Sequence, residues 1–116
     1  MNKYELLKKH FGYDSFREGQ ERLIDAILAG CDVLGVMPTG AGKSICYQIP
    51  TLMLPGITLV ISPLISLMRD QVMALKAAGI PAAFLNSTLT GPQMQAAYRN
   101  LLAGRYKIVY VAPERL

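Results

Sequence analysis

The 116-residue sequence contains no tryptophan, only one histidine and only two cysteines. Cys31 and Cys46 form no CxxC pair, and His10 lies far from both of them in the sequence. Neither a disulfide framework nor a zinc site is supported, because each needs several such residues at regular, close spacing. We expect both cysteines to be buried, reduced thiols of a cytosolic protein.

Acidic residues and long hydrophobic runs are also scarce. Eight Asp and Glu against twelve Lys and Arg give a net charge of +4, and the basic residues are dispersed, so charge alone favours a nucleic-acid partner only slightly. No apolar run is long enough to span a membrane, and the N-terminus lacks the apolar core of a secretory signal. Hydrophobic residues make up 52% of the chain, which excludes intrinsic disorder, and its length fits one domain at most.

Predicted helices and strands alternate along the chain, which indicates an α/β fold with a mostly parallel sheet and flanking helices. Capping-box spacing predicts helix starts at Asn2, Ser15 and Thr90, and Pro50 should stop or kink the helix that contains it. The unbroken apolar segment 57–62 favours a strand covered on both faces. The predicted strands are residues 32–37, 57–62, 82–86 and 106–112, and the helices begin near residues 2, 15, 43, 63 and 90.

A glycine-rich loop follows the first predicted strand and leads into a helix. Gly40 and Gly42 let successive backbone N–H groups point inward, as a phosphate-binding loop requires. Lys43 would reach the β- and γ-phosphates of a nucleotide, and Ser44 would offer its hydroxyl to Mg²⁺. The strict phosphate-loop pattern, GxxxxGK(S/T), requires glycine at its first position, where this sequence has Met37. The alternative to a phosphate-binding loop is a glycine-rich turn with an incidental lysine. The loop comprises Met37, Pro38, Thr39, Gly40, Ala41, Gly42, Lys43 and Ser44.

Several segments resemble motifs of the RecQ-type DNA helicases of superfamily 2. The Met-Pro-Thr-Gly opening of the loop is similar to motif I of that superfamily, which commonly starts with Ala or Met. The resemblance spans nearly the whole chain. It rests on FGYDSFREGQ at 11–20 (motif 0), MPTGAGKSICYQIP at 37–50 (motif I), VISPLISLMRDQV at 60–72 (motif Ia), YVAPERL at 110–116 (motif Ib) and LNST at 85–88.

This resemblance implies a P-loop, RecA-like fold and an ATP-dependent helicase that moves 3′-to-5′ along DNA. It implies ATP and Mg²⁺ as cofactors, with Lys43 in a catalytic role. It further implies single-stranded and duplex DNA as partners, a role in recombination and repair, no membrane partner, and a location at the nucleoid of a bacterial cytoplasm.

The family's motif 0 recognises adenine, which gives three residues a role by position. Tyr13 and Arg17 would sandwich the base, since a phenol ring and a guanidinium plane both stack on flat rings. Gln20 would bond the adenine edge, because its amide both donates and accepts hydrogen bonds. The alternative is that Tyr13 is a surface aromatic and Gln20 a solvated helix residue.

The family also implies a DNA-binding groove beyond the ends of three strands. For Ser62, the alternative to a DNA contact is a role as a helix cap. Arg69 and Asp70 could equally form a solvated face of the helix. Arg115 is either a phosphate contact or an exposed chain end. The residues implied to contact DNA are Ser62, Pro63, Leu64, Ser66, Asn86, Ser87, Pro113 and Glu114.

One element that such a helicase needs is absent from the sequence. After Asp70 the sole acidic residue is Glu114, so the chain contains no D-E-x-H motif to hold Mg²⁺ and position water. We therefore expect an incomplete RecA-like domain, truncated before the acidic-motif strand, with little ATP turnover alone and with strand 32–37 lacking sheet neighbours. Residues 1–30 would carry motif 0, residues 31–116 would begin the ATP-binding domain, and further helicase domains would follow. The rival interpretation is a non-catalytic nucleotide- or nucleic-acid-binding module.

Overall fold

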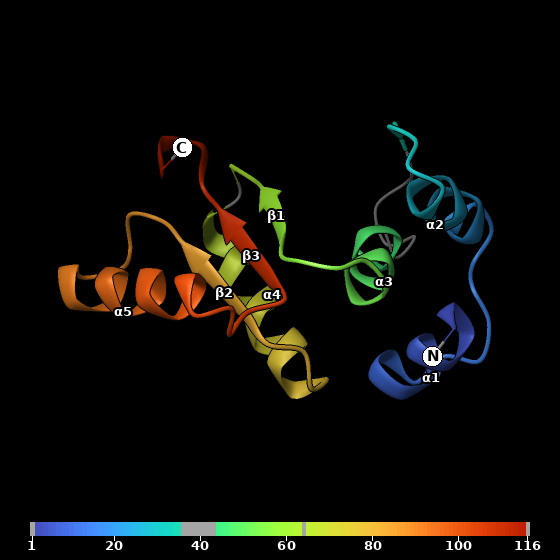
Figure 1. The fold of residues 1–116 in the computed structure, drawn as a ribbon, viewed down its shortest axis with the longest axis horizontal. Helices are drawn as coiled ribbons and strands as arrows, with labels where there is room; N and C mark the ends of the chain where they lie inside the picture. The colour runs from blue at the N-terminus through green and yellow to red at the C-terminus, as the bar shows by residue number, and fades with distance from the viewer. Residues whose placement is uncertain (1, 36–43, 64, 116) are drawn as a thin grey trace. The chain divides into compact units, whose positions relative to one another are not determined.

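A computed structural model of the chain describes residues 2–35, 44–63 and 65–115 (Figure 1). Packing divides it into two units, Met1–Pro55 and Gly56–Leu116. The third helix belongs to the first unit because it packs with the first two helices. The first unit holds α1 (Lys3–Phe11), α2 (Gln20–Leu28) and α3 (Ile45–Met53). The second holds β1 (Thr58–Ile61), α4 (Ile65–Ala77), β2 (Ala82–Leu85), α5 (Gly91–Leu102), β3 (Ile108–Val111) and the 3₁₀ turn η1 (Pro113–Arg115).

Local hydrogen bonding explains where the first two helices begin. The side-chain oxygen of Asn2 accepts a hydrogen bond from the N–H of Glu5 at 2.9 Å, so the predicted cap of α1 is confirmed. The predicted start of α2 at Ser15 is wrong, since α2 begins at Gln20. Gly19 precedes it with φ of 85°, a left-handed conformation that glycine adopts readily, and this turns the chain directly into the helix.

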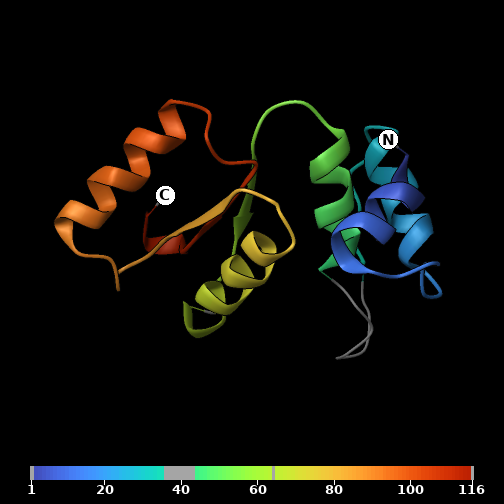
Figure 2. The same ribbon diagram turned by 90° about the horizontal axis from the view of Figure 1, so that it is seen from below.

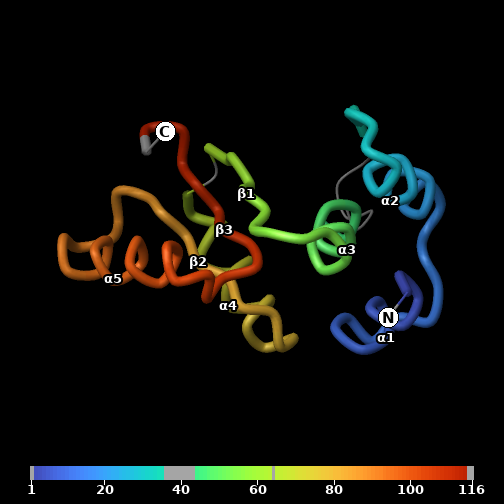
Figure 3. The backbone as a smooth tube through the Cα atoms, in the orientation of Figure 1, coloured from blue at the N-terminus to red at the C-terminus, as the bar shows by residue number. Residues whose placement is uncertain are grey.

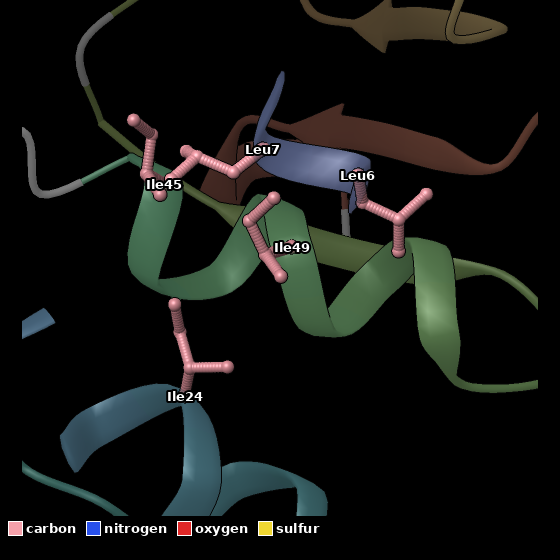
Figure 4. Packing of buried hydrophobic residues seen from close by; sticks show 5 residues of the cluster. All are labelled: Leu6, Leu7, Ile24, Ile45 and Ile49. Carbon is pink, nitrogen blue, oxygen red and sulfur yellow. The ribbon is translucent and has the colours of Figure 1, made fainter. Parts of the chain in front are cut away.

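Aliphatic side chains from all three helices form the core of the first unit. Ile24 of α2 and Ile49 of α3 are fully buried, and Leu7 of α1 is 1% exposed (Figure 4). The prediction that Pro50 stops or kinks the helix is wrong in its first form, because α3 continues to Met53. A proline removes one backbone hydrogen bond, and burial of the Pro50 ring beside Ile49 offsets that loss.

A charged cluster joins α1 to α2 at the surface. Lys3 Nζ lies 2.7 Å from Glu21 and 2.5 Å from Asp25, and the hydroxyl of Tyr4 also donates to Glu21. Hydrogen bonds from Lys3 and then Tyr4 hold the pKa of Glu21 below its ordinary value, despite some opposing desolvation.

We expect this cluster to stabilise the first unit above about pH 4.5, the ordinary Glu pKa, and to lose that effect as pH falls through the lower folded value. Stability falls in acid because the pKa of Glu21 is lower in the folded state, so the unfolded state binds the proton more readily. Melting temperatures of the wild type and Lys3→Met, compared between pH 3 and 7, should differ at pH 7 and converge in acid. A gap that is constant over this range would contradict the assignment.

The second unit is built on a parallel three-stranded sheet in the order β1-β3-β2 (Figure 3). Ile61, Val111 and Leu85 lie side by side in register at its carboxyl end. Figure 2 shows α4 and α5 on opposite sides of the strands, as right-handed crossovers place them. The central strand β3 is therefore buried along its whole length.

Strand β1 differs from the expectation that both its faces are covered. Leu59 and Ile61 are 55% and 48% exposed, whereas their register neighbours Val109 and Val111 are buried. The reason is that α5 packs over β2 and β3, and does not extend across β1. A run of apolar residues indicates a strand, but it does not determine which elements cover it.

The remaining expectations are met in part. The predicted capping box of α5, between Thr90 and Gln93, is confirmed in both directions. The helix predicted from Pro63 begins at Ile65. Residues 32–35 of the predicted strand 32–37 form no strand, while residues 36 and 37 lie outside the described part. Cys46 is buried as expected, but Cys31 is exposed. Among the described helices, none is long and apolar enough to cross a membrane.

Candidate nucleotide and nucleic-acid sites

A pocket of about 210 Å³ brings the three predicted adenine-binding residues together. Tyr13, Arg17 and Gln20 line it with Ser15, and Ile45 of α3 closes it. Tyr13 and Arg17 are exposed, whereas Gln20 is only 2% exposed. The alternative of a solvated Gln20 is therefore wrong.

Gln20 is held in place by the backbone of Arg17. The N–H of Arg17 donates to Gln20 Oε1 at 2.7 Å, and the N–H of Gln20 donates to the carbonyl of Arg17 at 3.1 Å. This reciprocal pair closes the turn that precedes α2. The side-chain amide of Gln20 is therefore already held at the pocket, which reduces the ordering cost of binding a ligand there.

The pocket adjoins the start of α3, the helix into which the glycine-rich loop leads. Ser44 directly precedes the helix, and its hydroxyl makes no capping hydrogen bond to it. The other predicted loop residues, Met37 to Lys43, lie outside the described residues. Ile45 was missed by sequence reasoning, although an apolar residue directly after the loop serine was a usable signal.

In the second unit, the predicted DNA-binding residues follow the carboxyl ends of all three strands. The N–H of Ser62 donates to the carbonyl of Val111 at 3.1 Å, and the N–H of Ala112 donates to that of Leu85 at 3.1 Å. These bonds extend the sheet by one residue and bring the three following loops to one edge. Ser66, Ser87, Pro113 and Glu114 are exposed there, and Leu64 lies outside the described residues.

Asn86 differs from its neighbours because it is 1% exposed and its side chain is used internally. Its Oδ1 accepts from the N–H of Thr88 at 2.9 Å and from the Thr88 hydroxyl, while Nδ2 lies 3.4 Å from Met68 Sδ. The Asn86 side chain therefore shapes the loop that exposes Ser87 and Thr88.

A second pocket, of about 550 Å³, lies at this edge of the sheet. Ser66 and Asn86 were predicted to lie together and do so. From the sequence alone the role of Arg69 was left open, and Phe84 and Gln93 were given no role. The residues that matter here are Ser66, Arg69, Phe84, Asn86, Thr88 and Gln93.

Comparison with known proteins agrees with these features. The sequence model of the DEAD/DEAH box helicases matches residues 17–116. The chain is 58% identical to the ATP-dependent DNA helicase RecQ of Haemophilus influenzae over 96% of its own length and 18% of that protein's. It is 53% identical to the ATP-dependent DNA helicase RecQ of Bacillus subtilis, over 96% of this chain and 19% of that protein. A crystal structure of a hypothetical ATP-dependent RNA helicase from Sulfolobus tokodaii matches with a TM-score of 0.72 and 27% identity, over 99% of this chain and 35% of that one.

The chain therefore belongs to the DEAD/DEAH box helicase family. The named relatives place it more narrowly among the RecQ-type members. The expected α/β class, with a parallel sheet, flanking helices and a RecA-like helicase neighbour, is confirmed. Family membership also implies use of a nucleotide, which the first pocket suits. The chain spans about a fifth of the length of the curated relatives it matches.

Proposed function

We propose that this chain contributes the ATP-binding elements, and one wall of the DNA groove, to an ATP-dependent 3′-to-5′ DNA helicase of recombination and repair. The observation that carries the proposal is the buried, oriented amide of Gln20 in a pocket at the start of α3. A stand-alone turn with an incidental lysine would not need such a pocket. The protein would act on DNA at the bacterial nucleoid, together with further helicase domains.

The nucleotide site we propose runs from the base pocket into the glycine-rich loop. Tyr13 and Arg17 bracket the adenine, Gln20 selects its edge, and the loop from Met37 to Ser44 binds the phosphates. Lys43 neutralises charge on the β- and γ-phosphates. Mg²⁺, held in part by the Ser44 hydroxyl, would supply further charge neutralisation when bound. Residues 1–30 carry the base-recognition part of this site, and residues 31–116 carry the phosphate and DNA parts.

The DNA-binding wall we propose lies at the carboxyl edge of the sheet. Ser62, Pro63, Leu64 and Ser66 follow β1, and Pro113 and Glu114 follow β3. Exposed hydroxyls and backbone N–H groups in these loops suit contacts to the sugar-phosphate backbone. After β2, Ser87 would make the contact, and Asn86 would hold its loop.

The test is base selectivity. Gln20→Ala should reduce the preference for ATP over GTP by about 1–3 kcal/mol, the scale of leaving buried polar partners unpaired. Calorimetric dissociation constants for both nucleotides measure it, with Gln95→Ala, an exposed position on α5, as the matched control. Unchanged selectivity in a folded Gln20→Ala variant would refute the assignment of the base pocket.

A further inference from the structure

The last turns of α5 carry two large apolar side chains on the face that does not meet the sheet. The inner stripe of the helix, which packs on the core of the second unit, consists of Met94, Ala97 and Leu101. Tyr98 is 42% exposed and Leu102 is 89% exposed. Leu102 follows Tyr98 by four residues, so the two side chains are neighbours on the helix surface. Exposed apolar side chains that lie together, and not singly, mark a candidate interaction site.

Two arginines accompany this apolar pair. Arg99 lies three residues before Leu102 and is exposed, and Arg105 is exposed in the loop after the helix. Arg105 Nη1 lies 3.3 Å from Asn100 Oδ1, and the N–H of Arg105 donates to the carbonyl of Asn100 at 3.0 Å. These two bonds hold the loop at the end of α5. Arg105 is thus fixed near Arg99, and most N–H donors of its guanidinium remain available to a partner.

No carboxylate compensates these two positive charges. The sequence has no Asp or Glu between Asp70 and Glu114, and neither arginine has an ion pair within the part of the chain that the structure describes. Asp70 lies on α4, on the other side of the strands (Figure 2). Glu114 follows the carboxyl end of β3, whereas the end of α5 leads into the amino end of that strand. A partner at this surface must therefore supply the negative charge.

The composition of this surface favours a protein over a nucleic acid. Phosphates would pair with the arginines, but they would gain nothing from covering Leu102. Tyrosine and arginine are among the residue types that contribute most at protein interfaces. A symmetric contact with a second copy is disfavoured, because it would bring the same uncompensated arginines together. Attraction of Arg99 to the carboxyl end of its helix does not explain why Leu102 is exposed.

We propose that the surface formed by Tyr98, Arg99, Leu102 and Arg105, the α5 surface, docks an acidic amphipathic helix of a protein partner. Apolar side chains of that helix cover Tyr98 and Leu102, and carboxylates beside them pair with the two arginines. The α5 surface lies toward the amino edge of the sheet. The proposed DNA wall lies at the carboxyl edge, so a docked partner leaves that wall accessible.

The test measures binding of a fluorescein-labelled helical peptide to the chain by anisotropy. The peptide has leucine at every third or fourth position, which forms one apolar face, and glutamate on both sides of that face. Leu102→Ser and Arg99→Gln should each weaken binding about fivefold or more, as truncation of a central interface residue does. Circular dichroism of both variants checks that the exposed substitutions leave the fold intact.

Two control variants match these substitutions in chemistry and exposure. Leu34→Ser removes a leucine that is 91% exposed in the first unit, and Lys76→Gln removes one positive charge from the last turn of α4. Neither should change the affinity for the peptide. Added salt should diminish the effect of Arg99→Gln, because salt screens exposed charge pairs, and should leave the effect of Leu102→Ser.

Three outcomes would overturn the proposal. The first is a wild type that does not bind the peptide. The second is equal binding by the wild type, Leu102→Ser and Arg99→Gln. The third is a wild type that binds a labelled DNA duplex more tightly than the peptide, with duplex binding weakened by Arg99→Gln and unchanged in Leu102→Ser, which would assign the α5 surface to nucleic acid.

Discussion

Replacement of Lys43 by alanine is expected to weaken ATP binding about 10- to 150-fold, the range for losing a hydrogen bond to a charged group. The reason is that the ammonium group is the only side-chain cation within the glycine-rich loop. Titration calorimetry of the wild type and the variant measures the ratio. Lys76→Ala, an exposed lysine in the last turn of α4, is the matched control and should bind ATP as the wild type does.

The two variants separate a loop-specific effect from a general one. Equal affinity of wild type and Lys43→Ala, with both folded by circular dichroism, would contradict a phosphate-binding loop at residues 37–44. Equal losses in Lys43→Ala and Lys76→Ala would indicate that net charge, and not the loop, governs binding.

Ile49→Ala is expected to lower the free energy of unfolding of the first unit by about 2–5 kcal/mol. Ile49 is fully buried where side chains of α1 and α2 meet α3, so the truncation leaves a cavity between helices. Urea titration followed by the helical dichroism signal measures the change. Leu34→Ala provides the control in the same unit, because Leu34 is 91% exposed and should change stability by less than about 0.5 kcal/mol.

The outcome of this pair also tests the division of the chain into two units. A loss in Ile49→Ala no larger than that in Leu34→Ala would contradict the three-helix core. Protection of the β3 amides from hydrogen exchange reports on the second unit. Neither substitution should change that protection if the two units unfold separately.

Features of the fold that depend on residues close together in the sequence were predictable from the sequence. The caps at Asn2 and Thr90 each need one side chain and a backbone N–H three residues ahead, so their spacing identifies them. The same spacing rule gave a wrong prediction for the start of α2. Ser15 and Glu18 have capping spacing, but the turn that the Arg17 backbone makes with Gln20, together with the left-handed Gly19, begins the helix later.

Features that depend on what covers a residue were not predictable. The apolar run of β1 is the same whether one face is covered or both, and only the reach of α5 decides that Leu59 is exposed. The candidate sites divide in the same way. Tyr13, Arg17 and Gln20 lie within eight residues and were found together, whereas Ile45 joins them only through the packing of α3. A sequence does not show that the Asn86 amide is buried.

The order of the strands bears on how the second unit assembles during synthesis. Within the described residues, β1 and β2 do not pair with each other, and each pairs only with β3, which comes last along the chain. Pairing β1 with β3 joins residues about fifty positions apart, such as Thr58 and Ile108. Contacts this distant in sequence close slowly, because the loop between them must be ordered first. A ribosome making this chain therefore exposes two apolar strands until residues 108–111 emerge, and this interval is when the nascent chain most needs protection from aggregation.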